Sequence, residues 1–377
     1  MKIMGSREKQ EKLEKLRAQG IPVYSFSMLE TTQNCPYEAY LTYVKNKRAE
    51  QIQNIYAGVG GATHDCLEDI MNGRATEADL YPRIHNALDE LEMCGVTFPK
   101  GSKDPDSIRN SWIANMDHFA KTYNAPKGKF ETEQFFLYKT PKGKYLQGYI
   151  DLLKIRSDGT VEIYDYKTST AYSGQDKHRH AKQLLLYALG KEQEGYTVKT
   201  IAWIFLKYCE AYYFGRQKIT AKEETQCKKV IERKKLVKEL DPIIRRKLTE
   251  LDLDSDTIDL LMAQALDTNE IPEQVKEQFT IKPHVLKYEL SDETKREAEE
   301  YFDNAIADWE HKLTIMNEAN EKELFPPLAF TKKKKNGEEV PDDFYHAQLC
   351  GYRKICPYLQ DYLASKEVAP KEEDDWF

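Results

Sequence analysis

The chain has 377 residues, of which 40% are hydrophobic and 32% are charged, and its formal net charge is −7 at pH 7. These values are typical of a globular protein with one large domain or two ordinary ones. The negative balance excludes a globally basic nucleic-acid binder, so any nucleic acid would be held by local basic patches. No run of eighteen apolar residues is present, and the first residues lack the apolar core of a signal peptide. We therefore expect a cytoplasmic protein that spans no membrane, with its seven cysteines reduced or metal-bound.

The first third of the chain is expected to be helical. Amphipathic spacing and helix-start residues predict helices at residues 7–19, 36–44, 56–71, 77–93 and 106–123, with another opened by a capping box of Ser27 and Glu30. In the 56–71 helix, His64 and Glu68 fall on one face. Gly58, Gly60 and Gly61 are small enough to let another backbone approach this helix closely.

The pattern then changes to strands. They are expected at residues 130–139, 148–156, 160–168 and 200–208, with a helix at 181–191 before the last of them. Ser157-Asp158-Gly159 has the composition of a three-residue hairpin loop, in which the glycine takes positive φ.

This hairpin brings acidic side chains together. Folding the chain about Asp158 places Asp151 opposite Asp165, and because side chains alternate with period two, Lys167 lies on the same face. Opposed like charges destabilise a sheet unless something binds between them, and a divalent cation with oxygen ligands is the simplest candidate. Water activated beside such a cation is what a metal-dependent phosphodiesterase needs. The alternative is a solvated edge hairpin in which Lys167 only pairs with one acid.

The second half of the chain is more charged. Residues 220–283 are expected to be a helical insertion whose charged face is either solvated or a surface for DNA or a partner. Ser291 or Asp292 is expected to cap a long helix. The predicted buried stripe of that helix is Ala298, Tyr301 or Phe302, Ala305, Trp309 and Leu313. Lysines at 332–335 are expected in a hairpin or loop that touches DNA nonspecifically, and residues 359–377 in an acidic tail.

Four motifs stand in order along the chain. They are Gly61-Ala62-Thr63-His64 with Leu67-Glu68, Gly148-Tyr149-Ile150-Asp151, Asp165-Tyr166-Lys167-Thr168, and Gln183-Leu184-Leu185-Leu186-Tyr187. In order and spacing they resemble RecB-type nucleases of the PD-(D/E)XK superfamily, whose relatives include the nuclease domains of RecB and AddB, CRISPR adaptation nucleases and phage exonucleases. The resemblance implies an α/β fold with a restriction-endonuclease-like core, a mixed central sheet flanked by helices. That core would comprise residues 25–219 and 284–358, after an N-terminal helix within 1–24 and around the insertion.

The resemblance also implies a metal site. His64 would supply an imidazole nitrogen, a ligand that suits Mn²⁺ better than Mg²⁺ alone. Asp151 and Asp165 would be the carboxylate ligands, and the backbone carbonyl of Tyr166 would complete the protein side. Glu133, on the preceding strand, is a weaker candidate for an outer ligand or a water contact.

Other positions would act on the water and the DNA. By resemblance, Lys167 would orient or help deprotonate the attacking water and stabilise charge on the phosphate. Gln183 and Tyr187, one helical turn apart, would position the water and the scissile phosphate. Lys177, Arg179 and Lys182 precede this helix in a segment close enough to contact backbone phosphates, or else in a solvated loop.

Cysteines define a second feature. In iron-sulfur members of this group, one cysteine before the core and three near the C-terminus hold a [4Fe–4S] cluster. Cys35, Cys350 and Cys356 fit three of these positions, but the fourth is Ala347; the adjacent His346 is a weaker candidate for that ligand, since imidazole replaces thiolate in some clusters, although its position is not equivalent. A cluster, a degenerate site with buried thiols and a zinc site all remain open.

Two functions are consistent with these residues. The first is a metal-dependent DNA exonuclease that works on single-stranded or unwinding DNA ends in recombination, replication, repair or spacer capture. Because no Walker motif is present, a helicase or a CRISPR partner would be a separate protein. The second is a noncatalytic scaffold that keeps the nuclease fold to bind DNA ends or a partner. Asp151, Asp165 and Lys167 are all retained, which favours the enzyme.

Overall fold

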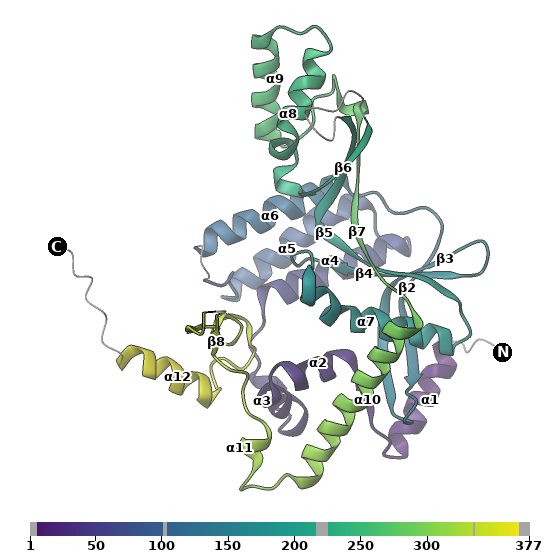
Figure 1. Ribbon diagram of the computed structural model, residues 1–377, viewed down its shortest axis with the longest axis vertical. Coiled ribbons are helices and arrows are strands. Elements are labelled where there is room, and N and C mark those ends of the chain that lie inside the picture. The colour runs from purple at the N-terminus through teal and green to yellow at the C-terminus, as the bar shows by residue number, and fades with distance from the viewer. Residues whose placement is uncertain (1–5, 101–103, 216–224, 335, 369–377) are drawn as a thin grey trace.

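A seven-stranded mixed sheet forms the centre of the molecule in a computed structural model that describes residues 6–100, 104–215, 225–334 and 336–368 (Figure 1). The strands are β1 (Val23–Ser25), β2 (Lys129–Lys139), β3 (Tyr145–Ile155), β4 (Val161–Lys167), β5 (Val198–Gly215), β6 (Thr225–Glu232) and β7 (Phe279–Tyr288). The path β1-β3-β4-β5-β6 is joined by β2, which pairs with β3, and by β7, which pairs with β5. A separate hairpin pairs β8 (Thr331–Lys333) with β9 (Glu339–Pro341).

Helices cover both faces of this sheet (Figure 1). They are α1 (Ser6–Ala18), α2 (Phe26–Asn34), α3 (Pro36–Ala39), α4 (Ile55–Met71), α5 (Leu80–Met93), α6 (Pro105–Thr122), α7 (Gly174–Gln193), α8 (Leu236–Thr249), α9 (Ser255–Thr268), α10 (Asp292–Ile315), α11 (Glu321–Leu324) and α12 (Pro357–Val368). One apolar core lies between the sheet and α2, α7 and α10, and a second lies between the other face and α4, α5 and α6. The mixed sheet between helical layers confirms the expected fold class. Within the described ranges, no helix is both long and apolar enough to cross a membrane.

The β3–β4 hairpin folds with the predicted register. Leu153 pairs with Ile163 and Ile155 with Val161 in an antiparallel ladder, and Gly159 in the loop has φ +81°. The ladder ends at Leu152 and Tyr164, one pair before the two aspartates. Turn chemistry and alternation therefore set this register locally.

The start of α2 differs from the prediction. Ser25, at the end of β1, has the extended backbone of an N-cap and accepts a 3.2 Å hydrogen bond from the Met28 amide. Ser27 lies inside the first turn instead, because the strand already ends at Ser25. The run predicted at 36–44 is α3, with Pro36 in its first turn, followed by a π-helical turn over Tyr40–Val44.

The segment at 220–283 is only partly helical, which corrects the expectation. Helices α8 and α9 are present, but β6 and the first half of β7 are strands. Both pair with the second half of the long strand β5. These elements form a lobe with its own apolar core, seen at the top of Figure 1. Four side chains of β6 are exposed, and its sequence lacks the apolar alternation that indicates a strand. Residues 216–224 lie outside the described ranges.

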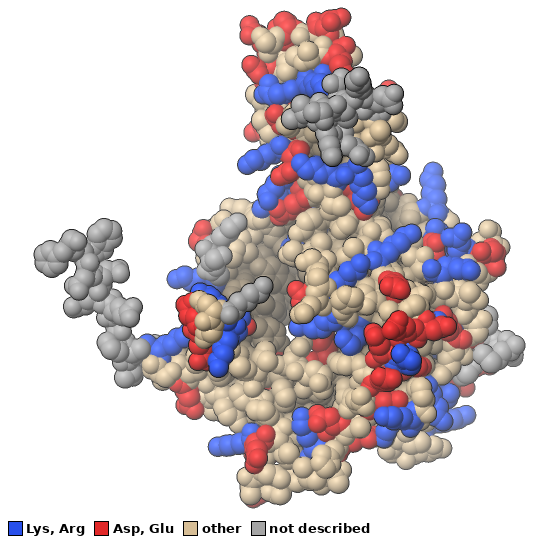
Figure 2. All heavy atoms as spheres, viewed as in Figure 1, with Lys and Arg blue, Asp and Glu red and all other residues tan. Residues whose placement is uncertain are grey.

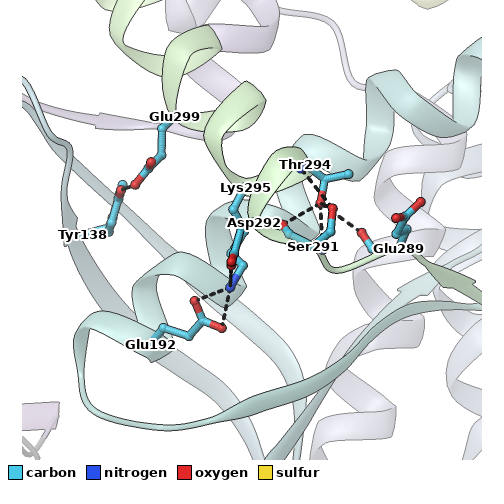
Figure 3. A network of polar contacts seen from close by, with 8 residues as sticks. All are labelled: Tyr138, Glu192, Glu289, Ser291, Asp292, Thr294, Lys295 and Glu299. Carbon is cyan, nitrogen blue, oxygen red and sulfur yellow. Dashed lines mark hydrogen bonds and ion pairs between the residues drawn. The ribbon is translucent and has the colours of Figure 1, made fainter.

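Helix α10 is anchored to α7 by polar contacts at its start. Ser291 caps α10, accepting from the Thr294 amide, and Lys295 lies 3.1 Å from both carboxylate oxygens of Glu192 on α7 (Figure 3). The predicted buried stripe is confirmed for Ala298, Phe302, Ala305 and Trp309. Leu313 was predicted to be buried but is 38% exposed, because α10 extends past the sheet it covers.

Helix α12 occupies part of the segment expected as an acidic tail. It extends to Val368, and residues 369–377 lie outside the described ranges. The lysines predicted to lie in a hairpin or a loop begin in β8, which forms a hairpin with β9. Lys335 itself lies outside the described residues.

Close packing of α7 on β2 gives a stability test at Gly190. A Cβ at this position would lie 2.5 Å from Cδ2 of Phe136, which is fully buried. We expect Gly190→Ala to lower the free energy of unfolding by about 1–3 kcal/mol, because overpacking outweighs the gain in helix propensity. Gly61→Ala is the matched helical control, since a Cβ there meets nothing within 4 Å. Urea unfolding of both variants measures the difference; equal stability of the two would contradict this packing.

Candidate active site

Two aspartates and a lysine converge where β3 and β4 leave the hairpin ladder. Asp165 is 2% exposed, and its Oδ2 lies 2.7 Å from Nζ of Lys167. Lys167 is therefore the ion-pair partner of Oδ2, and no second donor among the described residues hydrogen-bonds to this oxygen. Asp151 Oδ2 accepts a 3.0 Å hydrogen bond from the Tyr166 amide. The two carboxylates therefore belong to one pocket, as the register predicts.

Helix α7 places an amide and a phenol against the lysine. Lys167 Nζ donates to Oε1 of Gln183 at 3.3 Å, and Gln183 Nε2 donates to the Tyr187 hydroxyl at 2.8 Å. Burial acts to lower the pKa of Lys167, but the Asp165 carboxylate beside it is decisive and raises that pKa above its ordinary value. Lys167 therefore remains positively charged, and its contacts with Asp165 and Gln183 fix the position of its ammonium group.

His64 approaches the pocket from α4. Its Nδ1 lies 3.4 Å from Asp151 Oδ2, and its ring packs edge to face on Tyr166 with centroids 6.0 Å apart. Burial lowers the pKa of His64, which favours the neutral imidazole at neutral pH. A neutral ring keeps one nitrogen lone pair for a ligand. Gly60, one turn earlier in α4, allows the close approach of Thr168: a Cβ there would lie 3.3 Å from its Oγ1.

The other two glycines of α4 have different surroundings. At Gly58 the close neighbour is the side chain of Leu91, and at Gly61 there is open space. The expectation of a close backbone approach was therefore wrong for this helix, because side chains make the contacts.

Glu133 adds a third carboxylate from β2. The pairs Thr132 to Leu152 and Gln134 to Ile150 place it across from Asp151, and its φ is +46°, a strained conformation for glutamate. Burial, followed by the charges of Glu68, Asp65 and Asp165, raises the pKa of Glu133. The backbone at this position departs from regular strand geometry beside the acidic pocket.

The pocket has the character of a cation site. Burial and then the charge of Asp165 raise the pKa of Asp151 well above its ordinary value, although Lys167 opposes this shift. In the described part of the chain, no three His, Cys, Asp or Glu side chains form a group that could hold a metal by themselves. Asp151 and His64 do present an oxygen and a nitrogen 3.4 Å apart, near the ~3 Å expected between neighbouring ligands bound at about 2.1 Å from one ion. Together with the Asp165 carboxylate, these residues fit a divalent cation that also uses main-chain or water ligands.

Sequence reasoning missed three residues beside Lys167. Glu30 of α2 has its Oε1 3.7 Å from Nδ1 of His180, and the ring of Tyr172 stacks on His180 with centroids 4.0 Å apart. Burial raises the pKa of Glu30, while the charges of Arg179 and Lys167 oppose that rise. Glu30 comes from a helix more than a hundred residues earlier, and no local pattern in the sequence links it to the site.

The basic residues expected before the Gln183 helix lie inside it, because α7 starts at Gly174. Arg179 is 55% exposed, Lys177 lies over the ring of Tyr288 at 5.7 Å, and Lys182 lies over Tyr301 at 4.8 Å. The expectation of a solvated loop was therefore wrong. Figure 2 shows a hollow in this face of the molecule, with Lys and Arg side chains on its α7 side and the β8–β9 hairpin opposite.

The cysteines expected near a cluster are all buried. Cys35, Cys350 and Cys356 are free thiols that are at most 7% exposed, and burial raises the pKa of Cys350 to about 12. His346 is 3% exposed, and its ring packs against Phe330. Among the residues that the structure describes, these side chains do not form a metal-holding group, so the cluster finds no support.

Comparison with known proteins agrees with this geometry. The family model for the PD-(D/E)XK nuclease superfamily matches residues 23–357. No curated protein gives a significant match to the chain.

The raised pKa of Asp151 predicts a pH-dependent cost to folding. A carboxylate with a raised folded-state pKa contributes stability that is complete below its unfolded pKa and is lost as pH rises through the folded value. In the presence of a chelator, the Tm of Asp151→Asn should therefore rise relative to that of wild type as the pH increases from about 5 to about 8, because the substituted side chain cannot ionise. Differential scanning fluorimetry measures the gap.

Asp176→Asn, whose side chain is 69% exposed, is the control and should show no such trend. A gap between Asp151→Asn and wild type that stays constant with pH would show that this carboxylate does not oppose folding.

Proposed function

The chain belongs to the PD-(D/E)XK nuclease superfamily, a family of metal-dependent nucleases, and we propose that it is a DNA exonuclease that hydrolyses phosphodiester bonds at DNA ends with Mg²⁺ or Mn²⁺. The observation that carries the proposal is the contact set of Lys167. Its ammonium group touches Asp165 on one side and Gln183 on the other, beside Asp151. This arrangement requires both the hairpin register and the docking of α7.

In this proposal the metal ligands are Asp151, Asp165, His64 and the backbone carbonyl of Tyr166, with Glu133 as an outer or water contact. The donors combine carboxylate oxygen and imidazole nitrogen, a set compatible with Mn²⁺ as well as Mg²⁺. When bound, the cation supplies Lewis-acid chemistry and a water of lowered pKa. The fit is supported by the mutual repulsion of the acids.

The remaining residues orient the substrate and the water. Lys167 is held as a cation and is placed to stabilise negative charge that develops on the phosphate. Gln183 fixes the direction of the ammonium group, and Tyr187 in turn fixes the amide. Because Gln183 donates to Tyr187, its carbonyl oxygen is the atom that faces Lys167; a flipped amide would turn its NH2 toward the ammonium group and lose that contact.

Exposed cations at the start of α7 support a DNA path into this pocket. Arg179 is exposed one helical turn before Gln183, and Lys177 lies further toward the helix start. The hollow in Figure 2 lies beside α7. Backbone contacts of this kind position a strand without reading its sequence, which agrees with cutting from an end. Single-stranded or unwinding ends in recombination, replication, repair or spacer capture are the proposed substrates, with any helicase or CRISPR component a separate partner.

Substitution of the two central groups tests the activity. We expect Asp165→Asn and Lys167→Gln each to lower the rate on linear single-stranded DNA by about 10²-fold or more, in Mg²⁺ or Mn²⁺, since each removes a group at the developing charge. Lys129→Gln, at the exposed start of β2, is the matched control and should keep full activity. Release of labelled nucleotides from linear oligonucleotides, compared with circular single strands and RNA, is the measurement.

The noncatalytic scaffold gives a different pattern in the same assay. It predicts no cleavage of any linear or circular nucleic acid in either metal, with binding of DNA ends retained. Cleavage of circles as fast as linear strands would instead contradict the requirement for an end.

The α7 cations predict a salt-dependent affinity. In an Asp165→Asn background, Lys177→Gln with Arg179→Gln should weaken binding of single-stranded DNA and reduce the slope of log K against log salt by about 1.4, or ~0.7 per lost phosphate contact. Fluorescence anisotropy across a salt series measures the slope. The lobe pair Lys229→Gln with Lys235→Gln, both in ion pairs, is the control. A slope unchanged by the α7 pair would remove these residues from the DNA path.

A further inference from the structure

A cavity of about 730 Å³ lies on the side of β4 opposite the catalytic pocket. Its walls come from the end of α6, from the strands β3 to β5 and from the base of the lobe (Figure 1). Tyr166 lines it, whereas Asp165 and Lys167 point to the other face of the strand because side chains alternate. The cavity is therefore separate from the candidate active site, although Tyr166 borders both.

Arg233 places a buried guanidinium group at this cavity. The residue is 4% exposed; Nε donates to the Leu206 carbonyl at 2.8 Å and Nη1 donates to the Thr122 hydroxyl at 2.9 Å. The Phe119 ring lies 5.4 Å away. Across the described ranges, no carboxylate lies within ion-pair distance of Arg233. A buried arginine keeps its charge, and holding that charge without a counter-ion is costly.

Most of the other charged residues at the cavity are also cations. Lys121 and Lys282 line it, are exposed, and make no ion pair with a carboxylate within the described part of the chain. Glu270 is the acidic residue of the described lining. The lining also contains Lys154 and Lys276, which pair with Glu162 and Glu273. The cavity therefore combines a buried cation and two solvent-facing cations that have no ion pair among the described residues, which suits an anion with more than one negative oxygen.

Aromatic rings form much of the remaining wall. They are Phe119, Tyr123, Phe130, Tyr164, Phe205 and Phe279. The hydroxyl of Tyr123 is buried and lies beside the hydroxyl of Tyr166. Aromatic faces bind planar rings by stacking.

We propose that this cavity is a binding site for a free nucleotide, with the phosphates on Arg233, Lys121 and Lys282 and the base among the aromatic rings. The volume lies within the range of roughly 300–1,000 Å³ found for small-molecule sites. A free nucleotide is favoured over a segment of the DNA substrate because the sheet separates the cavity from the catalytic carboxylates.

Binding to the full-length protein tests this site without depending on nuclease activity. The probes are ATP, dAMP, adenosine and inorganic phosphate, measured by isothermal titration calorimetry in a chelator so that no metal-bridged complex forms. We expect ATP to bind more tightly than dAMP, and adenosine or phosphate alone to bind at least about tenfold more weakly than ATP, because each keeps only half of the contacts. Lys121→Gln with Lys282→Gln should weaken ATP binding about tenfold or more.

Two further variants separate this site from the nuclease site. Ile271→Trp, which fills the cavity from the lobe, should block ATP. Asp165→Asn should bind ATP as wild type does. The proposal is overturned if no nucleotide binds to wild type, if ATP binding survives the double lysine variant unchanged, or if Asp165→Asn alters it. Binding of single-stranded DNA by the cavity residues, with no binding of free nucleotides, would also overturn it and assign the cavity to a strand.

Discussion

The carboxylates of Asp151 and Asp165 approach each other at the open end of the β3–β4 hairpin, and this repulsion is the constraint around which the site is built. Both are largely buried, where water screens charge poorly. Lys167 offsets part of the negative charge through its 2.7 Å contact with Asp165. The charge that remains raises the pKa of Asp151, and a divalent cation is the ligand that would relieve it.

The surrounding elements hold this pocket in place. Helix α7 contributes Gln183 and Tyr187, and its opposite side is anchored by Glu192 to α10. Helix α4 contributes His64 from the other side of the sheet, at a point where Gly60 leaves room for Thr168. The two helical layers therefore meet at the end of β4, so the site depends on both apolar cores.

Local sequence was enough to predict the hairpin and the contacts along it. The turn at Gly159 and strict alternation determine that Asp151, Asp165 and Lys167 share a face, and the structure brings them together. Glu30 could not be found in this way, because tertiary packing brings α2 to the site. Strand β6 was missed because its sequence has no apolar periodicity. The segment is a strand because it pairs with β5. The cap of α2 was misplaced by two residues, since the end of a three-residue strand leaves little pattern to detect.

Electron paramagnetic resonance of Mn²⁺ added to the full-length protein tests the central claim most directly. We predict protein-bound Mn²⁺ with nuclear modulation from one imidazole nitrogen, lost in His64→Gln, and a much weaker complex in Asp151→Asn. Equal Mn²⁺ affinity in wild type and Asp151→Asn, or a spectrum of free Mn²⁺ alone, would contradict the account that these side chains form one metal-binding pocket.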